Sequence, residues 1–280
     1  MAAAPSPPGA AAFFRLWREA ATIVRGSFYQ GSRQLPYASH RGQSIHYTVE
    51  GQGPLVVIQH GLLSSGASWK QAGFVDALSD RFRVACIDSL GHGLSDKPAD
   101  PSLYEQSQRA GDIVAVINDL GCERAHLIGY SMGGWMSVGV AKHHPERLAS
   151  LTVGGWDLVN GAASARPPGF TGEIKFDHLL AGARLAAPTL VEWVTPELEP
   201  GLRACWDVLS DLDGAAPAVL GLQVPVLLWN GRVDPYHDPM QAFASSNNLR
   251  FLSTVGDHLG AIVLHGGEGA KGLREFLERP

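Results

Sequence analysis

Short runs of apolar residues recur along the chain at the length of buried strands, and helical patterns separate several of them. Parallel strands that are buried on both faces form continuous apolar runs, because their connecting helices cover both sides of the sheet. The pattern therefore predicts an α/β fold with a mostly parallel sheet. The predicted strands are residues 55–59, 82–87, 125–128, 148–153, 226–229 and 251–255.

One helical pattern lies between the second and third of these strands. Ile113, Val116, Ile117 and Leu120 fall at positions i, i+3, i+4 and i+7, and Gly121 follows them. This spacing predicts a helix with one buried stripe that ends at the glycine.

The alternation of strands and helices stops after Trp156, and about 70 residues pass before the next strand. Such a length is far beyond an ordinary connection. Apolar clusters at helical spacing occupy the gap, and prolines separate them. We expect a core domain of residues 34–156 and 222–280, with a small helical cap of residues 157–221 inserted into it. The clusters are Ile174, Leu179, Leu180 and Leu185, then Leu190, Val191, Trp193 and Val194, then Leu202, Trp206 and Leu209.

Residues 1–33 are expected to form an N-terminal arm and an amphipathic helix. Phe13, Leu16, Trp17, Ala20 and Val24 recur at helical spacing, with arginines on the other side. Nothing in the chain approaches the roughly 18 uninterrupted apolar residues of a membrane span. We therefore expect no stable membrane insertion and a cytoplasmic protein, with organelle targeting by this segment as the alternative.

Composition and charge narrow the class of partner. Of 280 residues, 45% are hydrophobic and 18% charged, which suits a chain with a large buried core. The net charge of −5, without a dense Lys/Arg block, argues against nucleic acid and favours a small neutral or apolar substrate. The three cysteines, Cys86, Cys122 and Cys205, form no CxxC pair and are expected to be reduced thiols.

We expect neither a metal nor a cofactor. The sequence contains no HExxH motif or Cys/His cluster that would indicate a metal site. Residues 267–272 match the dinucleotide pattern G-x-G-x-x-G, but only eight residues follow them, which leaves no room for the rest of a βαβ unit. We interpret them as a loop that enters the last helix.

The strongest chemical signal is Gly129-Tyr130-Ser131-Met132-Gly133, which directly follows a predicted strand and opens a helical pattern. A serine on a sharp strand-to-helix turn leaves no space for side chains two residues before or after it, so glycine is needed at both places. This turn exposes the serine hydroxyl and places the Met132 N–H where an oxyanion would form. Ser131 is therefore the candidate nucleophile.

A serine nucleophile needs a base and a carboxylate that orients the base, and both should follow it along the chain. Asp234 comes shortly after the strand at 226–229, and His258 comes after the strand at 251–255. Asp238 is the competing acid. His237 is interpreted as a solvated turn residue, and His265 lies too far from the strand end to be the base.

These motifs, in this order, resemble the α/β-hydrolase superfamily from about Gln43 to the C-terminus, in its branch of single-domain serine esterases, lactonases and perhydrolase-like enzymes. His60-Gly61-Leu62 follows the first strand, where the family places the loop that supplies a second oxyanion N–H, so the resemblance implies Leu62 for that role. Residues 88–96 resemble the family's D-x-x-G-x-G-x-S segment beside the active site. The resemblance implies an eight-stranded, mostly parallel sheet with helices on both faces and the cap after the sixth strand.

The resemblance also narrows the reaction. Relatives that open epoxides or remove halides carry aspartate at the elbow, whereas this chain has Ser131, so acyl-enzyme chemistry is expected. The loop after His60-Gly61 lacks the Gly-Pro-Gly of the family's C–C bond hydrolases, which weakens that branch without excluding it.

The expected function is hydrolysis of a carboxylic ester or lactone of a small, mostly apolar substrate through an acyl-enzyme on Ser131. Acyl transfer, perhydrolysis or C–C bond hydrolysis with the same triad is the alternative, and a hydrolase-fold ligand receptor with little turnover is another. Tyr130, Trp156 and Leu63 are candidates for the substrate pocket, with core packing as the equal alternative for the aromatic residues. The natural substrate and the oligomeric state stay open.

Overall fold

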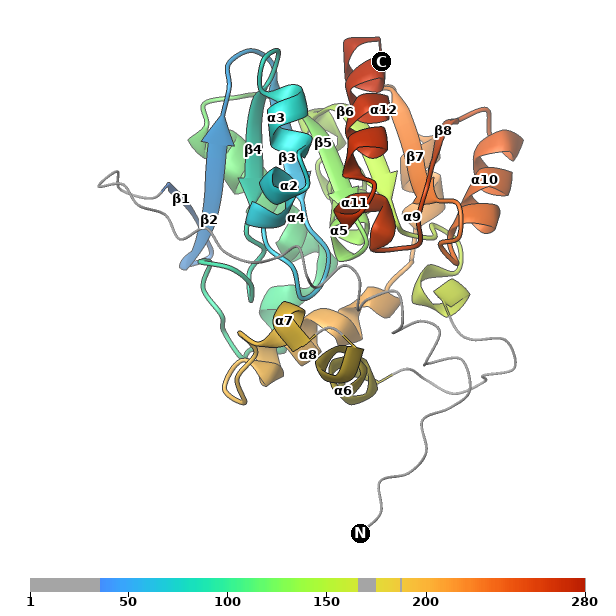
Figure 1. The fold of residues 1–280 in the computed structure, drawn as a ribbon. Coiled ribbons are helices and arrows are strands. Elements are labelled where there is room, and N and C mark those ends of the chain that lie inside the picture. The colour runs from blue at the N-terminus through green and yellow to red at the C-terminus, as the bar shows by residue number, and fades with distance from the viewer. Residues whose placement is uncertain (1–35, 166–174, 187, 280) are drawn as a thin grey trace.

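A computed structural model of the protein describes residues 36–165, 175–186 and 188–279. Its centre is one eight-stranded sheet in the order β1-β2-β4-β3-β5-β6-β7-β8 (Figure 1). The pairs β1–β2 and β2–β4 are antiparallel, and all other pairs are parallel. The strands are β1 (Tyr37–His40), β2 (Gln43–Glu50), β3 (Leu55–Gln59), β4 (Arg83–Ile87), β5 (Ala125–Tyr130), β6 (Leu148–Gly154), β7 (Val226–Gly231) and β8 (Arg250–Thr254).

Helices cover both faces of this sheet and also one of its ends. In Figure 1, α2, α3 and α12 lie on one face, α4 and α5 lie on the other, and α6, α7 and α8 lie beyond one end of the strands. The helices are α2 (Ala67–Gln71), α3 (Phe74–Leu78), α4 (Gln106–Asp119), α5 (Met132–His143), α6 (Phe176–Ala186), α7 (Pro188–Val191), α8 (Glu199–Asp207), α9 (Ala215–Leu220), α10 (His237–Ser246), α11 (Gly260–Val263) and α12 (Gly266–Glu278). Short 3₁₀ turns are η1 (Pro101–Tyr104), η2 (Pro145–Arg147), η3 (Gly161–Ala165) and η4 (Val208–Ser210).

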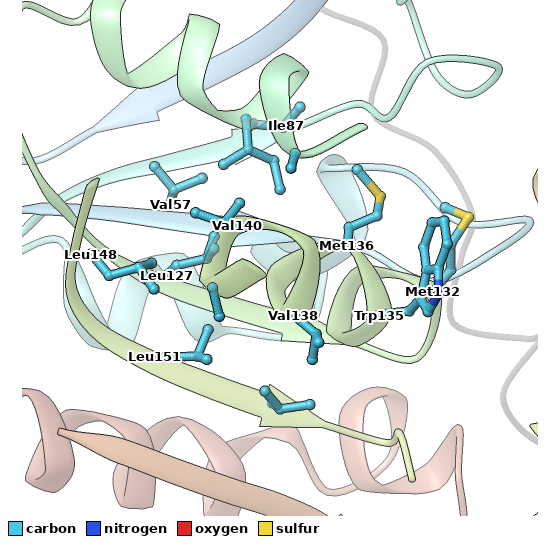
Figure 2. Packing of buried hydrophobic residues seen from close by; sticks show 14 of the residues in the cluster. Val57, Ile87, Leu127, Met132, Trp135, Met136, Val138, Val140, Leu148 and Leu151 are labelled. Atoms are coloured by element: carbon cyan, nitrogen blue, oxygen red, sulfur yellow. The ribbon is translucent and has the colours of Figure 1, made fainter. Parts of the chain in front are cut away.

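Strand β3 explains why the central sequences are apolar throughout. All five of its residues are buried, and successive side chains point to opposite faces. Val57 packs in the cluster under α4 and α5, while Val56 and Ile58 pack in the cluster under α3 and α12. Figure 2 shows the first cluster, in which Val57, Leu127 and Leu151 of the sheet meet Met136 and Val140 of α5.

The six sequence-predicted strands are all present, with boundaries shifted by at most two residues. The eight-stranded, mostly parallel sheet is confirmed, although the apolar pattern alone did not find β1 and β2. Their burial is incomplete, since β1 carries exposed residues and β2 carries partly exposed residues on both of its faces. The predicted N-terminal arm and helix of residues 1–33 lie outside the described residues.

The predicted cap region contains α6, α7, α8 and α9, and these helices lie between β6 and β7 in the chain. Two of its three apolar clusters fall mainly on α6 and α8, whereas Trp193 and Val194 follow the end of the short α7. Ile174, Pro167 and Pro168 lie outside the described residues. The division into core and cap stays a prediction.

Two smaller interpretations were wrong. His237 is not a solvated turn residue, since it begins α10, is only 8% exposed, and lies with its Nε2 2.9 Å from Ser253 Oγ. Residues 267–272 do not form a loop, because α12 already begins at Gly266 and contains all of them.

Candidate active site

Ser131 lies on the sharp turn between β5 and α5. Its backbone angles, φ 59° and ψ −123°, are strained for any residue with a side chain. Gly129 and Gly133 make this turn possible. A Cβ on Gly129 would lie 2.1 Å from the Gly133 carbonyl oxygen, and a Cβ on Gly133 would lie 2.2 Å from the Gln59 carbonyl oxygen. The two glycines are therefore required by close backbone approach, as the motif predicts.

A second loop, residues 60–66 between β3 and α2, passes directly beside the serine. A Cβ on Gly61 would lie 3.0 Å from Ser131 Cβ and 3.4 Å from its Oγ. Leu62 follows this glycine and is partly exposed. Met132, on the other side of the serine, is the first residue of α5, so its N–H has no preceding helical turn to bond. Of the two predicted oxyanion donors, Leu62 thus follows a glycine that lies beside Ser131, and Met132 follows Ser131 itself.

The structure brings the predicted serine, histidine and acid into one hydrogen-bonded chain. His258 Nε2 lies 2.9 Å from Ser131 Oγ, and His258 Nδ1 lies 2.9 Å from Asp234 Oδ2. An ionised carboxylate can only accept, so Nδ1 carries the proton and donates it to Asp234. Nε2 is then free to accept from the Ser131 hydroxyl, which is the arrangement a general base requires.

Burial and charge act in opposite directions on His258. Burial by itself lowers the pKa of this imidazole, but the Asp234 carboxylate outweighs it, so the pKa is held above its ordinary value. Asp234 is 4% exposed and its other oxygen, Oδ1, accepts from the Tyr236 N–H at 3.0 Å. The Tyr130 hydroxyl donates to Asp234 Oδ2 over a longer 3.4 Å. The acid is thereby fixed in position and can stabilise a protonated imidazole.

Two other acids near this edge of the sheet are directed elsewhere. The side chain of Asp238 is 92% exposed and bonds His237 Nδ1 at 2.7 Å. Asp157 follows β6 and is fully buried, but its Oδ1 accepts from the N–H groups of Val159 and Asn160 in its own loop. Of these three carboxylates, Asp234 is the one bonded to His258.

The predicted pocket residues lie in three different surroundings. Tyr130 is 2% exposed and packs against His258 and Trp229, with its ring 5.3 Å from that of His258 and 4.9 Å from that of Trp229. Trp156 packs 6.2 Å from Tyr236, whose ring meets His258 edge-on at 5.5 Å. Tyr236 was not predicted as a site residue, although its position two residues after Asp234 was a usable signal.

Leu63 belongs to an apolar cluster that covers the 60–66 loop. Its side chain is 1% exposed, and the cluster includes buried residues of α6, α7 and α8. Leu62 and Leu259 pack against the same cluster. The side chains next to the serine and the histidine therefore face an apolar layer supplied by the helices at the end of the sheet. The buried members are Leu63, Phe176, Leu179, Leu180, Ala183, Val191, Val194 and Leu202.

Within residues 36–165, 175–186 and 188–279, no group of three or more His, Cys, Asp or Glu side chains could hold a metal ion. In the same residues, no helix combines the length and apolarity needed to cross a bilayer.

Comparison with known proteins gives consistent results. The α/β-hydrolase-fold family model matches residues 54–204, which is more than half of the chain. A putative 2-succinyl-6-hydroxy-2,4-cyclohexadiene-1-carboxylate synthase of Bacillus subtilis is 34% identical over 113 residues, which are 39% of this chain and 40% of that protein. The match thus spans only about two fifths of this relative's length.

Longer matches come from enol-lactonases. The 3-oxoadipate enol-lactonase 2 of Acinetobacter baylyi is 27% identical over 209 residues, which are 69% of this chain and 76% of that protein. The crystal structure of the enol-lactonase from Burkholderia xenovorans LB400 superposes with a TM-score of 0.68 at 26% identity, covering 87% of this chain and 100% of that one. With the sheet order, the elbow and the family model in agreement, the chain belongs to the α/β-hydrolase fold family.

Proposed function

We propose that the protein is a serine hydrolase that cleaves a carboxylic ester or lactone of a small, mostly apolar substrate through an acyl-enzyme on Ser131. The observation that carries this proposal is the hydrogen-bonded chain from Ser131 Oγ through His258 to Asp234, with 2.9 Å at each contact. This chain provides a nucleophile, a base and an orienting acid.

In the proposed reaction, Ser131 Oγ attacks the substrate carbonyl carbon while His258 Nε2 accepts the hydroxyl proton. The N–H groups of Leu62 and Met132 stabilise the resulting oxyanion. His258 then donates the proton to the leaving alkoxide, the acyl-enzyme forms, and water activated by His258 releases the acid. Asp234 stabilises the imidazolium in each step, and the raised pKa of His258 supports that role.

Two observations support the substrate class. The serine and histidine are flanked by Leu62 and Leu259, which pack against the apolar cluster of α6, α7 and α8, so an apolar substituent on the substrate would be favoured there. The likeness to two enol-lactonases favours a lactone over an open-chain ester. The free cysteines Cys86, Cys122 and Cys205 are consistent with a reducing compartment such as the cytoplasm.

The first test is hydrolysis of short p-nitrophenyl esters and of simple enol-lactones by the wild-type protein and by Ser131→Ala. We expect the substitution to lower kcat by roughly 10⁴- to 10⁶-fold, because it removes the nucleophile. A Ser131→Ala protein that hydrolyses these substrates at the wild-type rate would refute the proposal.

A matched pair of carboxylates tests the acid. We expect Asp234→Asn to lower kcat by about 10⁴-fold, since the amide cannot hold His258 in the required tautomer. Asp238→Asn removes an exposed carboxylate four residues away and should leave kcat unchanged. Equal losses in the two variants would show that Asp234 is not the orienting acid.

A further inference from the structure

Among the buried histidines that the mechanism does not use, two lie in neighbouring loops beside the site. His60 and His92 are 1% and 0% exposed, and their rings meet edge-to-face with centroids 5.2 Å apart. His60 belongs to the 60–66 loop that carries Leu62, and His92 belongs to the loop of residues 88–96 after β4. Neither appears in the chain that links Ser131, His258 and Asp234.

Each of these histidines accepts a backbone N–H from the other loop. The Ser89 N–H donates to His60 Nε2 at 3.0 Å, and the Leu63 N–H donates to His92 Nε2 at 3.2 Å. A third bond runs between the same loops, from the Gly66 N–H to Asp88 Oδ1 at 2.7 Å. We call the bonds that the His60 and His92 rings make with these two loops the histidine clasp.

The remaining ring nitrogens fix the tautomer of both histidines. His60 Nδ1 lies 2.7 Å from the Gly61 carbonyl oxygen, and His92 Nδ1 lies 3.3 Å from the Leu90 carbonyl oxygen. A carbonyl only accepts, so both Nδ1 atoms carry protons and both Nε2 atoms are acceptors. Burial lowers the pKa of His60 to about 4 and also lowers the pKa of His92 well below its ordinary value, which keeps both rings neutral.

The clasp acts on the two peptide units that surround Leu62. The Gly61 carbonyl and the Leu62 N–H belong to one planar trans peptide, so they point in opposite directions. His60 Nδ1–H and the Ser64 N–H both hold that carbonyl, the latter at 3.3 Å, and thereby set where the Leu62 N–H points. His92 holds the next peptide unit through the Leu63 N–H, at a residue whose φ of 64° is strained.

We propose that His60 and His92 are positioning residues that orient the Leu62 N–H toward the oxyanion, each by holding a peptide unit that flanks Leu62. The inference rests on the proposed function, because it assumes that Leu62 is an oxyanion donor. A misdirected donor weakens the transition state more than the bound substrate, so the clasp should act on kcat and leave KM nearly unchanged.

The decisive variants are His92→Phe and His92→Gln. Phenylalanine keeps a ring in the cavity but offers the Leu63 N–H no acceptor, whereas the glutamine amide oxygen can replace Nε2. We expect His92→Phe to lower kcat for p-nitrophenyl acetate on the order of 10- to 100-fold with KM within about twofold, and His92→Gln to recover most of that loss. Phenylboronic acid, which forms a tetrahedral adduct on serine, should lose affinity by about the same factor as kcat/KM.

His126→Phe is the matched control. His126 is a half-buried histidine that is also bonded through its side chain, with Nδ1 2.8 Å from Ser150 Oγ, but it stands near the start of β5, at the opposite end of that strand from Ser131. Its replacement should leave kcat and boronate affinity unchanged. A folded His92→Phe protein with wild-type kcat would overturn the clasp and leave the proposed function standing, whereas an active Ser131→Ala protein would refute the proposed function itself.

A measurement on the wild-type protein covers the case in which His92→Phe fails to fold. Two-bond ¹H–¹⁵N correlation spectra report which ring nitrogen carries the proton. At pH 7 we expect both His60 and His92 to be neutral and protonated on Nδ1. Protonation of Nε2 on either ring would remove an acceptor of the clasp and overturn the inference.

Discussion

The elbow around Ser131 and the loop of residues 60–66 meet at the same point, yet they are held in place by different means. The elbow depends on the absence of side chains, because Gly129 and Gly133 let backbone atoms approach so closely that no Cβ atom would fit. The 60–66 loop is instead held by side-chain hydrogen bonds to its backbone. His60 bonds it from within the loop, and His92 and Asp88 bond it from 29 and 22 positions away in the chain.

This difference decides what a sequence can reveal. A local steric requirement leaves a compact motif, so the G-x-S-x-G pattern located the elbow and its serine. The clasp depends on bonds between segments that the fold brings together, and neither histidine stands in a spacing that signals a partner. Leu62 was therefore predicted through the family resemblance, whereas no role was predicted for His60 or His92, although both lie in segments that carry the resemblance.

The largest effect should come from breaking the elbow. A Cβ on Gly133 would collide with the Gln59 carbonyl oxygen at 2.2 Å and would lie 2.8 Å from that of His60, and neither backbone group can move without disturbing β3. We expect Gly133→Ala to lower the free energy of unfolding by about 3 kcal/mol or more, measured by urea denaturation.

Gly267→Ala is the control for that substitution. Gly267 lies in α12, and nothing among the described residues lies within 4 Å of the position its Cβ would take. Alanine favours helix there, so the free energy of unfolding should stay constant or rise by up to about 1 kcal/mol. A Gly133→Ala protein as stable as Gly267→Ala would show that the elbow is not fixed by backbone approach.

The histidine clasp should have a smaller effect, which is a dependence of the free energy of unfolding on pH. Because the pKa of His60 is lowered to about 4 and that of His92 is also lowered, the unfolded chain binds protons below pH 6.5 that the folded protein does not. The free energy of unfolding should fall as the pH drops from about 6.5 toward 4, by about 1.4 kcal/mol per pH unit for each histidine that stays neutral.

Two other histidines also change the free energy of unfolding with pH, and neither obscures the effect of His92. The raised pKa of His258 adds stability that is complete below pH 6.5 and is lost as the pH rises through that pKa, so its effect lies at higher pH. His126, whose pKa burial also lowers, adds to the slope in wild type and variant alike. We expect His92→Gln to reduce the slope by about 1.4 kcal/mol per pH unit, measured by urea denaturation at pH 4.5, 5.5 and 6.5. Equal slopes in the two proteins would contradict the neutral, buried state of His92.

In the rest of the fold, too, local patterns were predictable from the sequence and contacts between distant segments were not. Continuous apolar strands such as β3 were predictable, since burial on both faces leaves a run that needs no partner information. Strands β1 and β2 were not found from their pattern, because partial exposure breaks the run. His237 was misread because its burial depends on β8, where Ser253 bonds its ring, and not on its own sequence neighbours.

In the proposed reaction Ser131 forms the covalent intermediate, and mass spectrometry can detect whether it does. The protein would be treated with a fluorophosphonate, digested, and its peptides analysed, with Ser131→Ala treated in parallel. We expect a single stoichiometric adduct on Ser131, none on the variant, and loss of ester hydrolysis in proportion to labelling. An adduct on another residue, or full hydrolytic activity in protein that is labelled at Ser131, would contradict the proposed reaction.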